Sequence, residues 1–438
     1  MTGAIIKMEK YNTGLARRIA EGAMDSELTR VYGYAIEHQR TRYSRIADKY
    51  TAQFNEAPEE FYSAPGRSEL VGNHTDHQHG CVVAASINMD IVAAIKKRSD
   101  LTVRLYSEGF GLIETDLSNL DVEPSEAGTT SALIKGVAYA FKNGLFSENG
   151  QISEPFGFDA YVESDVPAGS GVSSSAAFEV LIGNIFCGDN AEEQRTRIAQ
   201  IGQFAENNYF GKPSGLMDQL ASSLGGVTFM DFRDPAHPET QSLPFDVTKA
   251  GYNLCIIDTH SSHADLTPEY AAITHDMKAI ASHFGKEVLR DVAPELFFVD
   301  IKKLRELFGD RAVLRCLHFY EEINRVMSAR DALGRQDAEA FLEAVNGSGR
   351  SSFAYLQNIY ATGSVKEQGV AVALGIAEKL LGGRGALRVH GGGFAGTIMA
   401  FVPTEMTPGF KTEIEKVLGE GSCRVMKIRK MGGARLKI

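Results

Sequence analysis

The stretch ESDVPAGSGVSSSAAFEVLIGNIF, residues 163–186, carries the clearest structural and chemical signal in this sequence. A proline and two glycines at 167–171 predict a tight loop, and the serines at 173–175 then begin a strongly apolar helix. Backbone N–H groups and hydroxyls at a helix N-terminus, where the helix dipole favours an anion, suit the phosphates of a nucleotide. The expected nucleotide-binding residues are Pro167, Gly169, Ser170, Gly171, Ser173, Ser174, Ser175 and Ala176.

Two common nucleotide-binding loops do not fit this stretch. No lysine follows the glycines, so the loop is not a Walker A motif, and GSGVSS differs from the dinucleotide-binding fingerprint. A serine-capped helix after a glycine turn is the purely structural alternative. A second segment, GGGFAG at 391–396, matches GxGxxG, but a strand rather than a helix is expected after it.

The bulk composition predicts a globular protein of two domains. A chain of 438 residues is too long for one compact core. The net charge of −11 argues against general affinity for nucleic acid or anionic membranes. The five cysteines form no CxxC pair, so neither a disulfide framework nor a zinc ribbon is indicated. We find no signal-peptide pattern and no apolar run of about 18 residues, so a cytoplasmic location is expected.

The order of strand-like and helical segments predicts an α+β fold. Helices are expected at 129–143, 174–187, 192–209, 267–284, 302–309, 311–334, 337–346 and 366–381, and strands near 159–163, 227–231, 253–257, 386–390, 397–402 and 424–429. Because these segments interleave without a regular βαβ rhythm, we expect mixed sheets rather than a doubly wound sheet. The predicted division is a helical extension (1–39), an N-terminal domain (40–215) and a C-terminal domain (216–438).

The loop and helix at 163–186 resemble the second motif of the galactokinase, homoserine kinase, mevalonate kinase and phosphomevalonate kinase superfamily. The segment at 387–402, LRVHGGGFAGTIMAFV, resembles the superfamily's third motif, a glycine loop that lies against the phosphate loop. This resemblance implies a two-domain α+β fold with an active site in the cleft between the domains.

Three further segments resemble the galactokinase branch. The signature of that family reads close to GRVNLIGEHTDYN, and its counterpart here is APGRSELVGNHTDHQHG at 64–80. The segment with the family's catalytic aspartate resembles AENNYFGKPSGLMDQLASSLGG at 205–226, and the segment with a sugar-contacting tyrosine resembles SSHADLTPEY at 261–270. The five local matches occur in the family's order and cover roughly residues 40–438.

The resemblance implies a role for individual residues. Asp218 is the expected catalytic base for the sugar anomeric hydroxyl. Arg67 keeps Asp218 ionised and stabilises charge on the transferring phosphoryl group. Mg²⁺ bridges the phosphates of ATP and is held by Glu206 and by a hydroxyl among the serines at 173–175, assigned to Ser174. The expected sugar contacts are Asn73, His74, Asp76 and Tyr270.

Each of these residues also has an ordinary structural interpretation, as a surface charge or a salt-bridge partner. The run HTDHQH at 74–79 allows a further alternative, a zinc or iron site. Short loops rarely let so many neighbouring side chains converge on one ion, and His77 and His79 read equally well as solvent-facing loop residues.

The signature departs from the family pattern at three positions. Asn73 replaces a glutamate, His77 replaces a tyrosine, and Glu69 replaces an asparagine. The arginine-rich stretch that usually follows the glutamate–tyrosine pair is also absent. A glutamate at position 73 would repel a sugar with a C6 carboxylate, whereas asparagine would tolerate it. Galacturonate therefore competes with galactose as the expected substrate.

The predicted function is an ATP- and Mg²⁺-dependent sugar 1-kinase, with galactose as first choice and galacturonate or a related sugar as alternatives. A catalytically silent sensor of galactose and ATP is the alternative from another class. Such regulators resemble active kinases but lack a Ser-Ala pair in the phosphate loop, which this chain keeps at Ser175 and Ala176. A superfamily member acting on a non-sugar alcohol is the third possibility, which the HTD and MDQ segments disfavour. The sequence does not indicate the oligomeric state.

Overall fold

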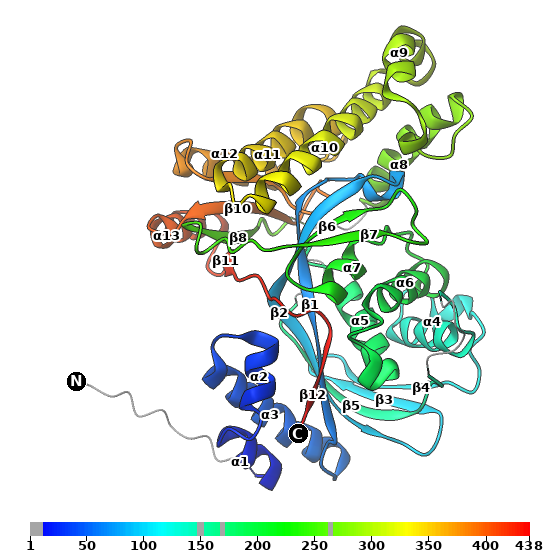
Figure 1. The fold of residues 1–438 in the computed structure, drawn as a ribbon, viewed down its shortest axis with the longest axis vertical. Helices are drawn as coiled ribbons and strands as arrows, with labels where there is room; N and C mark the ends of the chain where they lie inside the picture. Colours follow the sequence, from blue (N-terminus) through cyan, green and yellow to red (C-terminus); the bar gives the residue numbers. More distant parts are fainter. Residues whose placement is uncertain (1–11, 147–152, 167–170, 262–265) are drawn as a thin grey trace.

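The computed structural model describes residues 12–146, 153–166, 171–261 and 266–438, and it confirms the α+β class (Figure 1). Within these residues the larger sheet has eight strands in the order β12-β1-β2-β5-β3-β4, with β6 beside β2 and β7 beside β6. Its strands are β1 (Glu60–Val71), β2 (Cys81–Lys97), β3 (Thr102–Ser107), β4 (Gly111–Asp116), β5 (Phe158–Ser164), β6 (Val227–Asp231), β7 (Glu239–Leu243) and β12 (Ala434–Lys437). Only β3 and β5 pair in parallel, so the doubly wound alternative is excluded for the described residues.

A smaller antiparallel sheet has the order β11-β8-β10-β9. Its strands are β8 (Tyr252–Asp258), β9 (Ala386–Val389), β10 (Thr397–Pro403) and β11 (Cys423–Met426). The helices are α1 (Gly14–Ala20), α2 (Asp25–Tyr32), α3 (Ile36–Phe54), α4 (Thr130–Lys142), α5 (Ser174–Cys187), α6 (Arg195–Ala205), α7 (Met217–Leu224), α8 (Thr267–His283), α9 (Pro294–Phe308), α10 (Asp310–Gly334), α11 (Ala338–Ser351), α12 (Gly369–Leu381) and α13 (Thr407–Leu418). None of the described helices combines the length and apolar character needed to cross a membrane.

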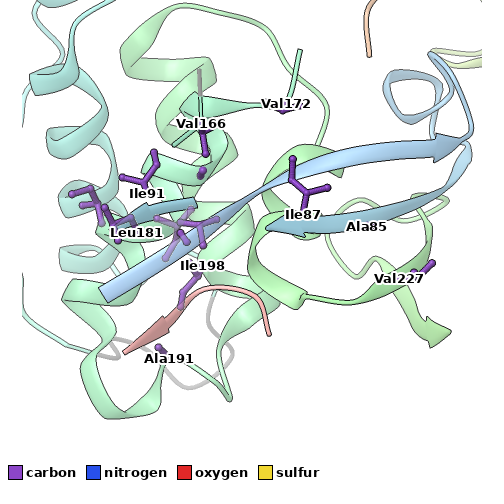
Figure 2. Packing of buried hydrophobic residues seen from close by; sticks show 14 of the residues in the cluster. Ala85, Ile87, Ile91, Val166, Val172, Leu181, Ala191, Ile198 and Val227 are labelled. Carbon is purple, nitrogen blue, oxygen red and sulfur yellow. The ribbon is translucent and has the colours of Figure 1, made fainter. Parts of the chain in front are cut away.

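The larger sheet is covered on both faces, because successive residues of a strand point to opposite sides. Tyr62 and Ala93 point into the main core under α4–α6, whereas Phe61 and Val92 point into a second core covered by α1–α3. Figure 1 shows these two helix groups on either side of the sheet. Figure 2 shows part of the main core, where Ile91 of β2, Leu181 of α5 and Ile198 of α6 lie in one cluster.

The N-terminal helices are joined to the sheet by a buried ion network around Asp90 of β2. Arg42 of α3 donates to Asp90 Oδ1 at 2.5 Å, and Arg429 donates to Oδ2 at 2.7 Å. Tyr32 of α2 donates to the same Oδ2 at 2.7 Å, and the Ser63 hydroxyl of β1 donates to it at 2.5 Å. The extension is therefore tied to the sheet by charge as well as by apolar packing.

Most predicted helices and strands are confirmed, with differences where local patterns are ambiguous. The apolar runs CVVAASI and IVAAIKK form one long strand, β2, because both pair with β1 across a register shift. Helix α9 begins at Pro294 rather than at 302, since proline suits the first helical position. The elements α7, β7, α13 and β12 escape prediction; α7, β7 and β12 have only 8, 5 and 4 residues, which leave little periodicity to detect.

The two sheets do not divide the chain at one point in the sequence. Strands β6, β7 and β12 all follow residue 216, yet they belong to the larger sheet with strands from the first half of the chain. The C-terminal segment leaves the smaller sheet after β11 and returns to pair with β1. Whether a functional boundary near residue 215 exists stays a prediction.

Candidate functional site

The N-terminus of α5 packs against the strand that follows the glycine-rich segment. Ser173, directly before the helix, has a left-handed backbone (φ 60°), as does Gly171 (φ 74°). A Cβ atom on Gly171 would lie 2.9 Å from the Thr397 hydroxyl oxygen of β10, so a larger residue would collide. Among the predicted nucleotide-binding residues, Pro167, Gly169 and Ser170 lie outside the described residues. The remaining ones, Gly171 and 173–176, lie at this helix start.

Arg67 of β1 and Asp218 of α7 form a bidentate ion pair beside this helix start. Arg67 Nε donates to Asp218 Oδ1 at 2.6 Å, and Nη2 donates to Oδ2 at 2.7 Å. Arg67 Nη1 donates to the carbonyl oxygen of Gly171 at 2.6 Å, and the Ser173 hydroxyl donates to Asp218 Oδ2. The structure thus brings the predicted base, the predicted arginine and two of the predicted nucleotide-binding residues, Gly171 and Ser173, together.

This environment keeps Asp218 ionised. Burial alone would raise the pKa of its carboxyl, but the charge and hydrogen bonds of Arg67 and the Ser173 hydroxyl hold that pKa below its ordinary value. The Asp218 side chain remains 28% exposed, whereas that of Arg67 is only 6% exposed. The carboxylate is therefore charged and partly accessible, as a proton acceptor requires.

Glu206 lies at the start of a π-helical turn, η4 (Glu206–Phe210), between α6 and α7. Its Oε1 atom accepts from Ser175 Oγ and from Lys212 Nζ, both at 2.9 Å, and its Oε2 atom accepts from Gln219 Nε2 at 2.9 Å. Gln219 also donates to Glu179 Oε2 at 2.9 Å. Glu206 is 2% exposed, so these protein donors rather than water solvate its carboxylate.

The donor atoms at Glu206 fit a magnesium ion. Mg²⁺ prefers hard oxygen ligands such as carboxylates and hydroxyls, and it usually completes its shell with substrate phosphates. Glu206 and the Ser175 hydroxyl supply such oxygens at the N-terminal turn of α5. In the described residues it is Ser175, rather than the predicted Ser174, that makes the hydrogen bond to Glu206.

The loop between β1 and β2, residues 72–80, holds the predicted sugar contacts His74 and Asp76. His74 has a left-handed backbone (φ 57°), and its Nε2 donates to the Gly392 carbonyl oxygen at 2.9 Å. Asp76 Oδ1 accepts from the His77 backbone N–H at 2.9 Å, and a Cβ atom on Gly215 would collide with Asp76 Oδ2. The loop therefore contacts the glycine-rich segment and the turn before α7.

Asp76 lies in an environment that disfavours its charge. Burial, together with the carboxylates of Asp218 and Glu69, raises the pKa of Asp76 to about 7. Arg67 hydrogen-bonds to Asp218 and offsets the charge of Asp76 only in part, so the pKa values of the two neighbouring acids shift in opposite directions. Perturbed carboxyls of this kind occur at functional sites.

Asn73 lies in a fully buried hydrogen-bond network. Its Nδ2 donates to the Gly391 carbonyl oxygen at 2.8 Å and to Glu69 Oε1 at 3.2 Å. Its Oδ1 accepts from Asn358 Nδ2 at 2.8 Å and from Ser352 Oγ at 3.2 Å. The side-chain amide is thus occupied by protein partners on both ends, and its role in sugar binding stays a prediction.

Glu69 and Asn73 exchange the residue types of the family pattern, and the structure places them in contact. Glu69 also forms an ion pair with Arg388 Nη2 at 2.5 Å, with side chains 4% and 0% exposed. Glu69 therefore places a carboxylate against the Asn73 side chain, where its Oε1 accepts from Asn73 Nδ2. Arg388 compensates its charge.

The remaining predicted sugar contact, Tyr270 of α8, packs on the glycine-rich segment. Its hydroxyl donates to the Gly393 carbonyl oxygen at 2.9 Å, and its ring packs edge-on against Phe394. A Cβ atom on Gly392 would lie 2.6 Å from the Tyr270 ring, so this contact requires glycine. His74 and Tyr270 therefore bind neighbouring carbonyls of one loop.

Comparison with known proteins is consistent with this geometry. Residues 48–97 match the model of the galactokinase galactose-binding signature, and residues 132–226 match that of the N-terminal domain of GHMP kinases. The galactokinase of Mannheimia succiniciproducens is 30% identical over 373 residues, which cover 85% of this chain and 91% of that protein. The chain belongs to the galactokinase family.

The solved structures agree with this assignment. The crystal structure of Lactococcus lactis galactokinase complexed with galactose superposes with a TM-score of 0.75 at 26% identity, covering 90% of this chain and all of the other. The Methanococcus jannaschii mevalonate kinase, at 13% identity and a TM-score of 0.58, covers 84% of this chain and 98% of its own, and it shares the fold. The predicted family, fold and class of enzyme, a phosphotransferase that uses a sugar hydroxyl, are confirmed.

Two histidines of the HTDHQH run have hydrogen-bond partners within the protein. His74 Nε2 binds a carbonyl oxygen, and His77 Nδ1 accepts from Gln78 at 3.2 Å. Burial lowers the pKa of His77 to about 3. Across the described ranges no three acidic, histidine or cysteine side chains are grouped to hold a metal ion.

Several residues that shape this galactokinase-family site were missed by sequence reasoning. Glu322 of α10 accepts the backbone N–H groups of Gly72 and Asn73 at 3.0 and 3.2 Å, and His318 contacts the Asn73 carbonyl oxygen at 2.9 Å. His390 contacts the Ser68 hydroxyl at 3.0 Å. Both α10 partners of the signature loop lie in ordinary amphipathic helix sequence, which carries no signal for such contacts.

Proposed function

We propose that this protein transfers the γ-phosphoryl group of ATP to the anomeric hydroxyl of galactose, with galactose 1-phosphate and ADP as products. The observation that carries the proposal is the Arg67–Asp218 pair at the N-terminus of α5. It places an ionised carboxylate and a guanidinium beside a helix N-terminus. Phosphoryl transfer needs this combination of a proton acceptor and fixed positive charge.

Asp218 acts on the sugar hydroxyl in this proposal. A carboxylate offers about four acceptor positions, and Arg67 and Ser173 use three of them. The fourth accepts the hydrogen bond of the anomeric hydroxyl and takes its proton during transfer. Arg67 holds the carboxylate in place and stabilises negative charge on the transferring group.

The nucleotide binds along the start of α5. The free N–H groups of the first helical turn and the positive end of its dipole attract the phosphates. Glu206 and Ser175 would hold Mg²⁺, which would supply positive charge to neutralise the phosphates. The sugar binds between 72–80 and the glycine-rich segment, where Asp76, His74 and Tyr270 surround it, in the cleft between the two predicted domains.

Galacturonate is the second candidate substrate, and one observation favours it. The residue at position 73 is neutral, and the acid that its side chain contacts, Glu69, is paired with Arg388. A C6 carboxylate would therefore meet less repulsion than in relatives with a glutamate there. Galactose remains first because Asn73 already uses its amide on protein partners and has no free donor for that carboxylate.

A coupled ADP-release assay with ATP and Mg²⁺ tests the proposal on galactose, galacturonate, N-acetylgalactosamine, arabinose and glucose. We expect turnover on galactose, and the Asp218→Asn variant should lose at least about a thousandfold in kcat, since general-base and electrostatic contributions are both lost. Asp246→Asn, at an exposed carboxylate, is the matched control.

The outcomes separate the candidates. Preference for galacturonate would replace galactose in the proposal, and an active, folded Asp218→Asn protein would remove the role given to Asp218. Binding of galactose and ATP without turnover would support the sensor alternative, against which the intact Ser175–Ala176 pair argues.

All five cysteines are free and buried, which supports the expected cytoplasmic location.

A further inference from the structure

The ammonium group of Lys212 forms an ion pair with Glu206, the carboxylate that is proposed to hold the metal. Lys212 follows Gly211, which ends η4 in a left-handed conformation (φ 83°). The Lys212 backbone N–H donates to the Glu206 carbonyl oxygen at 3.1 Å, so the start of the side chain is fixed. Its side chain is 59% exposed, whereas that of Glu206 is 2% exposed. One end of this ion pair can therefore move and the other cannot.

The hydrogen bonds of Glu206 leave no free position at Oε1. A carboxylate oxygen has two lone pairs, and Oε1 already accepts from Ser175 and Lys212. Ser175 belongs to the start of α5, and its hydroxyl can turn to offer a lone pair to a metal instead. Lys212 is a donor only, so a cation bound at Oε1 must displace its ammonium group.

After displacement from Glu206, the ammonium group of Lys212 remains near other charged side chains of the site. Lys212 is close enough to Asp218 and Glu179 to interact electrostatically with both carboxylates. Through Glu206 Oε1, which accepts from both side chains, Lys212 also lies beside Ser175 of the N-terminal turn of α5, where phosphates are expected. A lysine ammonium is a compact charge on a flexible four-carbon stem, which suits it to follow an anion.

We propose that Lys212 is an exchanging cation of the phosphoryl-transfer site: it neutralises Glu206 in the nucleotide-free protein and contacts the terminal phosphates of ATP once Mg²⁺ takes its place. This inference rests on the proposed function, because it assumes that ATP phosphates lie at α5. It adds a third positive group, beside Arg67 and the metal, to stabilise charge during transfer.

The test uses the full-length Lys212→Met variant, with Lys212→Arg as the conservative change and Lys249→Met as the control. Lys249 is likewise an exposed lysine paired with a carboxylate, Asp246. The first measurement is ATP affinity by calorimetry at saturating Mg²⁺, where the metal has displaced Lys212 from Glu206 in the wild-type protein. We expect about tenfold weaker binding for Lys212→Met, because a charge-assisted phosphate contact is lost, and wild-type affinity for the control. Lys212→Arg should keep most of the affinity.

The second measurement is Mn²⁺ binding to the nucleotide-free protein by electron paramagnetic resonance. Lys212→Met should bind Mn²⁺ several-fold more tightly than wild type, because the competing ammonium group is gone. A merely structural salt bridge would change the melting temperature but neither affinity. Unchanged ATP affinity at saturating Mg²⁺ overturns the phosphate contact, and unchanged or weaker Mn²⁺ binding overturns the exchange. Failure of the proposed function shows separately, as wild-type protein that binds ATP without turnover.

Discussion

The contact between Glu69 and Asn73 makes a strong prediction about exchanging the two residue types. In the Glu69→Asn variant, Arg388 loses its counter-ion in a site where neither side chain reaches solvent. At 2.5 Å and an effective dielectric constant of about 20, the Coulomb attraction is roughly 7 kcal/mol. Desolvation offsets much of this, and removing one partner of a buried pair costs roughly 3–5 kcal/mol in practice.

The Asn73→Glu variant should also be destabilised. It places a second carboxylate where the Asn73 amide now donates to Glu69 Oε1 and to the Gly391 carbonyl oxygen. Three acceptors would then meet, and one carboxyl must take up a proton to relieve the repulsion. In the double variant, the side chain at position 69 is shorter and that at position 73 is longer, so the new carboxylate occupies the space near Arg388.

We therefore expect the double variant Glu69→Asn/Asn73→Glu to lose less stability than the sum of the single variants, by at least about 2 kcal/mol. Urea unfolding of wild type, both single variants and the double variant measures the four free energies of unfolding. The galactose KM of the double variant tests whether the acid also serves the sugar. Additive single-variant effects, within about 0.5 kcal/mol, would refute the direct coupling.

Three more predictions concern single residues. Asp90→Asn should lower the free energy of unfolding by roughly 3–5 kcal/mol, since buried Arg429 loses the carboxylate that it pairs with and Arg42 loses one of its three. Burial opposes the charge of Asp90, but the arginines lower the pKa of its carboxyl to about 2. The stability that the ionised carboxylate contributes is therefore present above pH 4 and should be lost between pH 4 and 2. Urea unfolding of the wild type should show this loss, and urea unfolding of Asp90→Asn should not. Asp76, whose pKa is raised to about 7, destabilises the fold progressively as pH rises from 4 to 7. Calorimetry of Asp76→Asn should thus give a melting temperature a few degrees above wild type at pH 8 and no gain at pH 4; an equal gain at both would contradict the shift. Ser175→Ala should raise the Mg²⁺ concentration for half-maximal activity about tenfold and Ser174→Ala much less; the reverse order in a Mg²⁺ titration would return the role to Ser174.

Much of the site could be predicted from short segments. The serines at 173–175 follow a glycine loop and open an apolar helix, and this local pattern suffices to predict the start of α5. Arg67 and Asp218 could be predicted as site residues because each lies within a contiguous motif, the signature at 64–80 and the MDQ segment. Lys212 and Gln219 also lie within a motif. They were missed because the sequence does not show that both side chains donate to Glu206.

The sequence by itself determined the fold class, the family and the residue types of the site, because these depend on local pattern and on contiguous motifs. Only the tertiary structure decided which residues meet. Arg67 and Asp218 lie 151 positions apart and come together because β1 and α7 pack against each other. Likewise, only packing shows that Asn73 is enclosed and that Ser175 faces Glu206. Side-chain direction depends on the whole set of neighbours, and a linear motif contains only the nearest few.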